Sequence, residues 1–177
     1  DDGAALAAAA HAAGALFVVG VDPLSLGVLA TPASYGADIV CGDIQPLGMH
    51  MNYGGGQGGF IASHDDPAIV MQYPSRLFGI VPTSVPGEYG FGDVAYSRTS
   101  FDKRENGNEF VGTAAALWGI TAGVFLALMG PQGMSELATG IAQRTAYAKQ
   151  RMASIAGVRV THGGSCHFRE FVVNFDG

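Results

Sequence analysis

The sequence predicts an α/β fold, and three observations support this prediction. Short apolar runs bounded by Gly or Pro alternate with stretches of helical periodicity, as in strands joined by helices. Apolar residues make up 48% of the 177 residues and charged residues only 14%, a composition that packs into a core. The 27 glycines exceed the usual share and indicate many tight turns or close backbone approaches. This length suits one core rather than two.

The order of elements follows from the same patterns. We expect helices at 4–13, 24–29, 66–71, 110–129 and from 131 to a stop at 157, and strands at 15–21, 37–41, 59–63, 94–98, 158–160 and 170–175. The run 15–21 is continuously apolar, which is typical of a strand covered on both faces. Residues 73–92 hold three prolines and are expected to form a loop with a function. The run 110–129 has no ionisable side chain and is expected to be a buried helix.

The composition argues against membranes and nucleic acids. The stretches 4–21 and 110–130 are apolar enough to be mistaken for membrane spans, but they are rich in Ala and Gly and lack flanking Lys or Arg. The net charge of −6, without a basic cluster longer than a pair, gives no footprint for phosphate backbones. Cys41 and Cys166 form no disulfide framework, which favours a reducing, cytoplasmic compartment. The acidic start is unlike a signal peptide, and the abrupt first helix suggests a fragment.

Asp22 follows the strand expected at 15–21 and precedes Pro23. Open α/β sheets bind ligands at the carboxyl ends of their strands. This carboxylate could therefore pair with a cationic ring nitrogen of a cofactor. It could equally cap the helical turn that follows, and the sequence leaves both interpretations open.

A glycine-rich loop at 54–59 is the second candidate. The N–H groups of Gly54, Gly55 and Gly56 could cradle a phosphate, and close backbone packing is the alternative. The loop is not a Walker loop, because no Gly-Lys-Ser/Thr follows. It is not a dinucleotide fingerprint either, because it precedes a strand instead of opening a helix.

Two arginines, Arg98 and Arg104, are candidates for holding a substrate carboxylate or phosphate, with a solvated charged turn as the alternative. His162, Cys166 and His167 are metal-ligand types. Two of them are adjacent and no fourth ligand is near in the sequence, so no metal site is predicted.

An ordered set of motifs runs through essentially the whole chain. They are Phe17-Val-Val-Gly-Val-Asp-Pro-Leu-Ser-Leu-Gly-Val-Leu29, Tyr35-Gly-Ala-Asp-Ile-Val40, Gln45-Pro-Leu-Gly48, Gly54-Gly-Gly-x-x-Gly59-Phe, Tyr73-Pro-Ser-Arg76, Leu128-Met-Gly-Pro-Gln-Gly133 and Glu170-Phe-Val-Val173. In this order they resemble the N-terminal-half (subunit 1, A-type) chain of the glycine cleavage P-protein, glycine dehydrogenase (decarboxylating).

The resemblance implies the aspartate-aminotransferase-like (type I) fold of pyridoxal-phosphate enzymes, present in part. Residues 1–130 would be the end of the large domain, and 131–177 the start of the small α/β domain. The chain would be an enzyme subunit that supports glycine decarboxylation and aminomethyl transfer to the lipoyl carrier H-protein. Its partner in a hetero-oligomer would be a B-type subunit.

The resemblance also makes the positions of the lysines informative. Pyridoxal phosphate needs a lysine amine for its Schiff base. Alignment with the catalytic sister subunits places Pro46 at that position, and the chain's only lysines, Lys103 and Lys149, lie far downstream. The resemblance therefore implies no covalent cofactor and no catalytic residue in this chain, with the Schiff-base lysine on the partner. Asp22 would then belong to a vestigial site.

The segment 97–113 departs from the family pattern. Arg98, Arg104, Glu105 and Thr113 match, and most of the remaining residues do not. A non-catalytic relative that binds a small phosphorylated or carboxylate ligand in the old pocket is therefore the alternative prediction.

Overall fold

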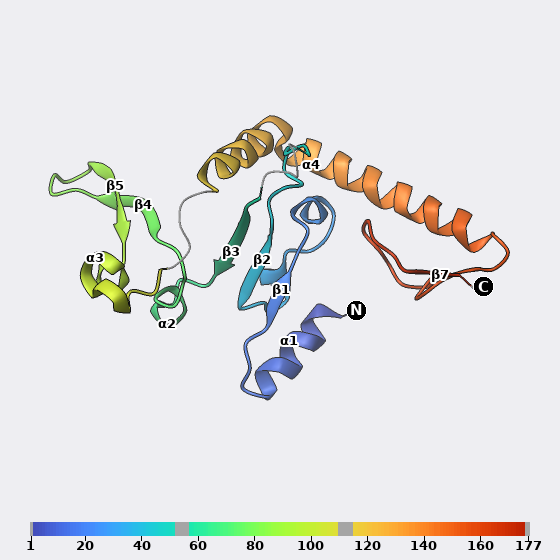
Figure 1. The fold of residues 1–177 in the computed structure, drawn as a ribbon, viewed down its shortest axis with the longest axis horizontal. Helices are drawn as coiled ribbons and strands as arrows, with labels where there is room; N and C mark the ends of the chain where they lie inside the picture. The colour runs from blue at the N-terminus through green and yellow to red at the C-terminus, as the bar shows by residue number, and fades with distance from the viewer. Residues whose placement is uncertain (1, 52–56, 110–114, 176–177) are drawn as a thin grey trace. The chain divides into compact units, whose positions relative to one another are not determined.

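The computed structural model describes residues 2–51, 57–109 and 115–175, and it divides into two compact units (Figure 1). Unit 1 comprises residues 1–61 and 117–177, and unit 2 comprises residues 62–116.

Unit 1 is built on a three-stranded sheet with the order β1-β2-β3. The strands are β1 Val18–Gly20, β2 Ile39–Asp43 and β3 Gly59–Ser63, and the last strand runs on into unit 2. β1 and β2 are parallel, with Val18 opposite Ile39. The helix α1 Gly3–Ala12 precedes β1. Two short 3-10 helices, η1 Pro23–Gly27 and η2 Pro32–Tyr35, lie between β1 and β2 in the chain. β1 is shorter than expected and its side chains are half exposed, so the prediction of a strand covered on both faces is wrong for the described chain.

The longest helix, α4, runs from Ala116 to Ala153 and breaks at Gly130, as the change of direction in Figure 1 shows. Gly130 has φ 59° and ψ −178°, a backbone conformation that side chains with a Cβ rarely adopt. Pro131 follows and cannot donate the N–H that a continuous helix needs. The sequence correctly predicts a helix that restarts at Pro131. The predicted domain boundary between residues 130 and 131 coincides with this kink and stays a prediction.

The core of unit 1 joins the segments after β1 and β2 to α4. Its buried members are Leu24, Ile44, Leu47, Met49 and Ala122. Gly27 lets η1 approach α4 closely, because a Cβ at this position would lie 2.4 Å from the carbonyl oxygen of Met134. The C-terminal strands β6 Val158–Val160 and β7 Val173–Phe175 pair antiparallel at the end of unit 1.

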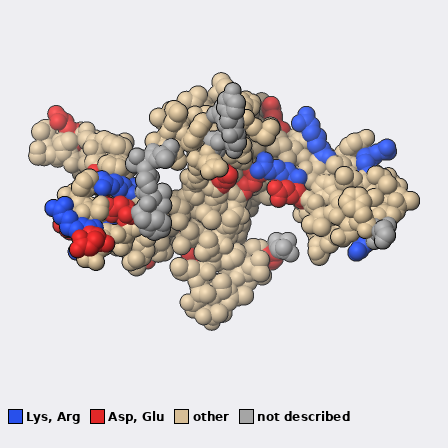
Figure 2. Space-filling model, viewed as in Figure 1, with Lys and Arg blue, Asp and Glu red and all other residues tan. Residues whose placement is uncertain are grey.

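One side of the first half of α4 is exposed within the described chain, contrary to the prediction of a buried helix, whereas Ala122 on its other side belongs to the core. Leu117, Ile120, Val124 and Leu128 are 64%, 65%, 63% and 82% exposed. Their spacing of three and four residues places them along one side of the helix. An uncharged surface also dominates the face seen in Figure 2. The sequence pattern indicates burial, but the surface that would cover this side is not among the described residues.

Within the described chain, α4 is one helix long and apolar enough, by length and composition, to cross a membrane. That length counts both halves together. The uninterrupted run from Ala116 to Met129 is only about 21 Å long at 1.5 Å per residue, shorter than the ~30 Å hydrocarbon core. The kink therefore divides this helix into two shorter helical segments.

Unit 2 centres on an antiparallel hairpin of β4 Leu77–Pro82 and β5 Tyr89–Val94, with Gly79 opposite Gly92. The prediction of a loop over 73–92 is wrong. Its prolines stand where they cost no ladder hydrogen bond, with Pro82 at a strand end and Pro86 in the turn. The strand expected at 94–98 is also wrong, because the chain turns into a 3-10 helix there. The helical segments are α2 Pro67–Val70, η3 Tyr96–Arg98, α3 Ser100–Lys103 and η4 Arg104–Asn106.

A carboxylate holds the helical segments of unit 2 to the hairpin. Glu109 Oε1 accepts a hydrogen bond from the backbone N–H of Ser100 at 2.5 Å. Arg76 Nη2 lies 3.6 Å from the same oxygen, and its guanidinium stacks on the ring of Phe101. Hydrogen bonds from the side chain and the backbone of Ser100, with a smaller contribution from the charge of Arg76, lower the pKa of Glu109.

Replacing Gly27 by Ala should destabilise the protein by about 1–3 kcal/mol, because the new methyl group must displace the α4 backbone. Gly140→Ala is the matched control, since a Cβ there meets nothing within 4 Å and alanine favours the helix. Denaturant unfolding of the two variants measures both changes. Equal stability of G27A and the parent protein would contradict the described contact.

Glu109→Gln should flatten the acid side of the stability profile. A folded-state pKa below the unfolded value stabilises the protein above the unfolded pKa, and this contribution disappears as the pH falls through the folded pKa. The unfolding temperature of the parent should therefore fall more steeply than that of E109Q between about pH 5 and about pH 3. Parallel profiles would show that Glu109 does not carry this pH dependence.

Candidate functional site

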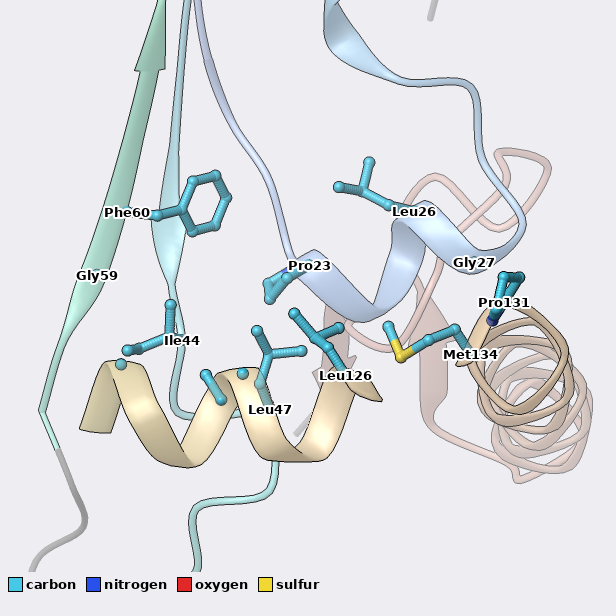
Figure 3. A pocket seen from close by; sticks show the side chains of 13 residues that line it. Pro23, Leu26, Gly27, Ile44, Leu47, Gly59, Phe60, Leu126, Pro131 and Met134 are labelled. Atoms are coloured by element: carbon cyan, nitrogen blue, oxygen red, sulfur yellow. The ribbon is translucent and has the colours of Figure 1, made fainter. Parts of the chain in front are cut away.

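A cavity of about 750 Å³ lies in unit 1, next to the segments that follow β1 and β2 (Figure 3). One wall comes from these two segments, a second from the start of β3, and a third from both halves of α4. The residues that line it are Pro23, Leu26, Gly27, Ile44, Leu47, Gly59, Phe60, Gly119, Ala122, Gly123, Leu126, Pro131 and Met134. The carboxyl end of a parallel strand pair is where open α/β sheets place ligands.

The walls of this cavity are apolar. Every described residue that lines it is Pro, Leu, Ile, Phe, Ala, Met or Gly, and none has a polar side chain. Only backbone groups could hydrogen-bond a ligand here. The cavity therefore suits an apolar group far better than a phosphate or a carboxylate.

Asp22 lies at the end of β1 and uses both carboxylate oxygens within the chain. Oδ1 accepts a hydrogen bond from the N–H of Leu24 at 3.0 Å, so Asp22 caps η1. Oδ2 lies 2.7 Å from Nε of Arg169, an ion pair whose geometry falls short of an aligned hydrogen bond. The structure thus shows the capping role, and pairing with a cofactor ring stays a prediction. Sequence reasoning missed Arg169, which is far away in the chain.

The other predicted cofactor residues give less information. Gly54, Gly55 and Gly56 lie outside the described residues. Pro46 is described, in the turn between the cavity residues Ile44 and Leu47. Pro46 therefore lies between two cavity residues, and its correspondence to the Schiff-base lysine stays a prediction.

Lys103 and Lys149 both lie outside the lining of this cavity. Lys103 ends α3 in unit 2. Lys149 lies in the second half of α4, where Nζ is 2.8 Å from the carbonyl oxygen of Ser165 and 2.7 Å from Nδ1 of His167. Among the described residues, no group of three or more His, Cys, Asp or Glu is arranged to hold a metal ion.

The two predicted substrate arginines lie in unit 2 and differ in their surroundings. Arg98 is 2% exposed and donates hydrogen bonds to the carbonyl oxygens of Tyr73, at 2.5 Å, and of Ser75. Its guanidinium therefore ties the segment preceding β4 to η3 through its two terminal nitrogens. Nε has no hydrogen-bond partner in the described part of the chain. Arg104 is exposed, with φ 54°. Their predicted role toward substrate stays a prediction.

A model of the family "Glycine cleavage system P-protein" matches residues 1–174. Among similar proteins, the "Probable glycine dehydrogenase (decarboxylating) subunit 1" of Staphylothermus marinus is 38% identical over 94% of this chain and 35% of the relative. The protein of the same name from Saccharolobus islandicus is 41% identical over 91% of this chain and 35% of the relative. The chain thus spans about a third of the length of these relatives.

A solved structure agrees with the sequence comparison. It is the crystal structure of glycine decarboxylase (P-protein) of the glycine cleavage system in inhibitor-bound form, with a TM-score of 0.80 and 39% identity over 89% of this chain and 36% of that chain. The described residues therefore have the fold of a part of that enzyme. From these matches together with the family match, we conclude that the chain belongs to the glycine cleavage system P-protein family.

Proposed function

We propose that this chain is part of subunit 1 of a glycine dehydrogenase (decarboxylating). In this proposal it supports pyridoxal-phosphate-dependent decarboxylation of glycine in the cytoplasm and pairs with a second subunit that carries the Schiff-base lysine. The released aminomethyl group passes to a lipoyl carrier protein. The names of the relatives, which are called subunit 1, support this assignment. Because the chain spans about a third of their length, the activity belongs to a larger assembly.

The proposal that the partner subunit binds the cofactor covalently depends on one observation, which is that the residues of this chain do not match the needs of the cofactor. Pyridoxal phosphate requires a lysine amine, a group facing its ring nitrogen and donors for its phosphate. Pro46 has no amine, and the carboxylate of Asp22 is bound to Leu24 and Arg169. The described walls of the cavity offer no polar side chain. These residues do not fit a covalently held cofactor, which supports its placement on the partner.

The chain's own contribution is therefore positional. The described cavity walls offer no polar side chain at the carboxyl end of the β1–β2 pair, and exclusion of water from this end in the assembly would strengthen polar interactions in an adjoining site. The Asp22–Arg169 pair holds η1 to the segment before β7. We assign residues 1–130 to the end of a large domain and residues from 131 onward to the start of a small one.

The alternative is a non-catalytic relative that binds a phosphorylated or carboxylate ligand in this cavity. The apolar walls speak against it, because a desolvated anion needs cations or N–H donors. Thermal stabilisation of the isolated subunit by inorganic phosphate or acetate would favour it.

The cofactor should travel with the second subunit. When the two full-length subunits are produced separately and supplied with pyridoxal phosphate, only the second should develop an imine absorption band that borohydride abolishes. Glycine-dependent carbon dioxide exchange should require both subunits. An imine band from subunit 1 alone would overturn the lysine argument.

Asp22→Asn should change stability and leave the cofactor spectrum of the assembled enzyme unchanged. Asparagine can still cap η1, so the main loss is the ion pair with Arg169, worth about 1 kcal/mol for a partly exposed pair. A double-mutant cycle with Arg169→Gln should recover this coupling, and Arg159→Gln on β6 is the control with no expected coupling to Asp22. A shifted imine band in D22N would instead place this carboxylate at the cofactor.

A further inference from the structure

A second cavity in unit 1, of about 420 Å³, has features that the proposed function does not use. It lies between the second half of α4, the residues after η1 and the segment after β6. The residues that line it are Val28, Leu29, Ala142, Ala146, Lys149, Ser165, Cys166, His167 and Phe168. None of them lines the first cavity. Its volume is in the range of small-molecule sites, about 300–1,000 Å³.

Most of the wall is apolar. Val28 and Leu29 supply one side and Phe168 another. Ala142 and Ala146 are one helical turn apart, so their small side chains lie on one side of α4 and leave room above it. A ligand would therefore place a carbon chain against this part of the wall.

One end of the cavity is cationic. Lys149 follows Ala146 on the same side of α4. Its ammonium group donates hydrogen bonds to the carbonyl oxygen of Ser165 and to Nδ1 of His167. An ammonium has three N–H donors, so one is left for a ligand. No carboxylate lies within ion-pair distance of Lys149 in the described residues. The charge is thus held in place without a counter-ion.

We propose that this second cavity binds a small monocarboxylate with a short, unbranched apolar tail. The carboxylate accepts a hydrogen bond from Lys149, and the tail lies along Val28, Ala146 and Phe168. A carboxylate fits better than a phosphate, because a single ammonium neutralises one charge and no arginine fork lines the site. The assignment is independent of the proposed function and concerns a different part of unit 1.

Alkylation of Cys166 can report ligand binding, because this thiol lines the cavity and is exposed. Cys41, which is partly buried on β2, is the internal control. In the full-length protein with its second subunit, octanoate should slow alkylation of Cys166, as measured by peptide mass spectrometry. At ten times the dissociation constant the rate should fall about tenfold. The rate at Cys41 should not change. Octanol, with the same tail and no charge, should give no protection at the same concentration.

Two lysine variants test the cation. Lys149→Met keeps an aliphatic side chain and should abolish protection by octanoate, and Lys149→Arg should retain it in part. Lys103→Met removes the chain's other lysine and should leave protection unchanged. An unaltered alkylation rate of Cys166 in ligand-free K149M confirms that the local fold is intact. If that rate rises, the variant has lost its local fold, and the role of the charge is then tested by comparing protection by octanoate and by octanol in the parent protein.

Three results would overturn the proposal. Equal protection by octanol would show that the tail binds without the charge. Equal protection by inorganic phosphate would show that any anion suffices. No protection by octanoate would show that the cavity does not bind this class of ligand in the assembled protein.

Discussion

The close contact between Gly27 and the carbonyl oxygen of Met134 is the constraint on which unit 1 depends. At this position the backbones of η1 and α4 approach so closely that no side chain fits between them. Gly27 and Met134 both line the first cavity, and the residues directly after Gly27 line the second. Gly27 thus positions parts of the walls of both cavities.

The Asp22–Arg169 pair acts on the same segment at the N-terminus of η1. Its carboxylate caps η1 with one oxygen and meets the guanidinium with the other, so two regions far apart in the chain share one residue. The ion pair is partly exposed, so its contribution to the free energy of unfolding is modest. The common effect of the cap and the ion pair is to keep Asp22 occupied within the chain, which accords with a cofactor held elsewhere in the proposed assembly.

Sequence reasoning succeeded where a local pattern has a local cause. The periodic apolar positions after Pro131 predict the second half of α4, and the motif order identifies the family. The prolines and glycines of 73–92 misled, because their place in a hairpin depends on which residues they oppose. The carbonyl partners of Arg98 lie about 25 positions away, so no local pattern could reveal them, and its role toward substrate stays a prediction. The exposed side of α4 likewise shows that an apolar run predicts burial without saying against what.

The break at Gly130 and Pro131 also has a consequence for cooperativity. It interrupts the ladder of backbone hydrogen bonds, so the two halves of α4 do not stabilise one another as one continuous helix would. Both halves contribute to the core, the first half through Ala122 and Phe125 and the second half through Met134 and Ile141. The first half also has one side of apolar residues uncovered in the described chain, so its stability depends in addition on the surface that covers that side. Amide exchange should therefore divide this helix into two cooperative units that meet at the kink.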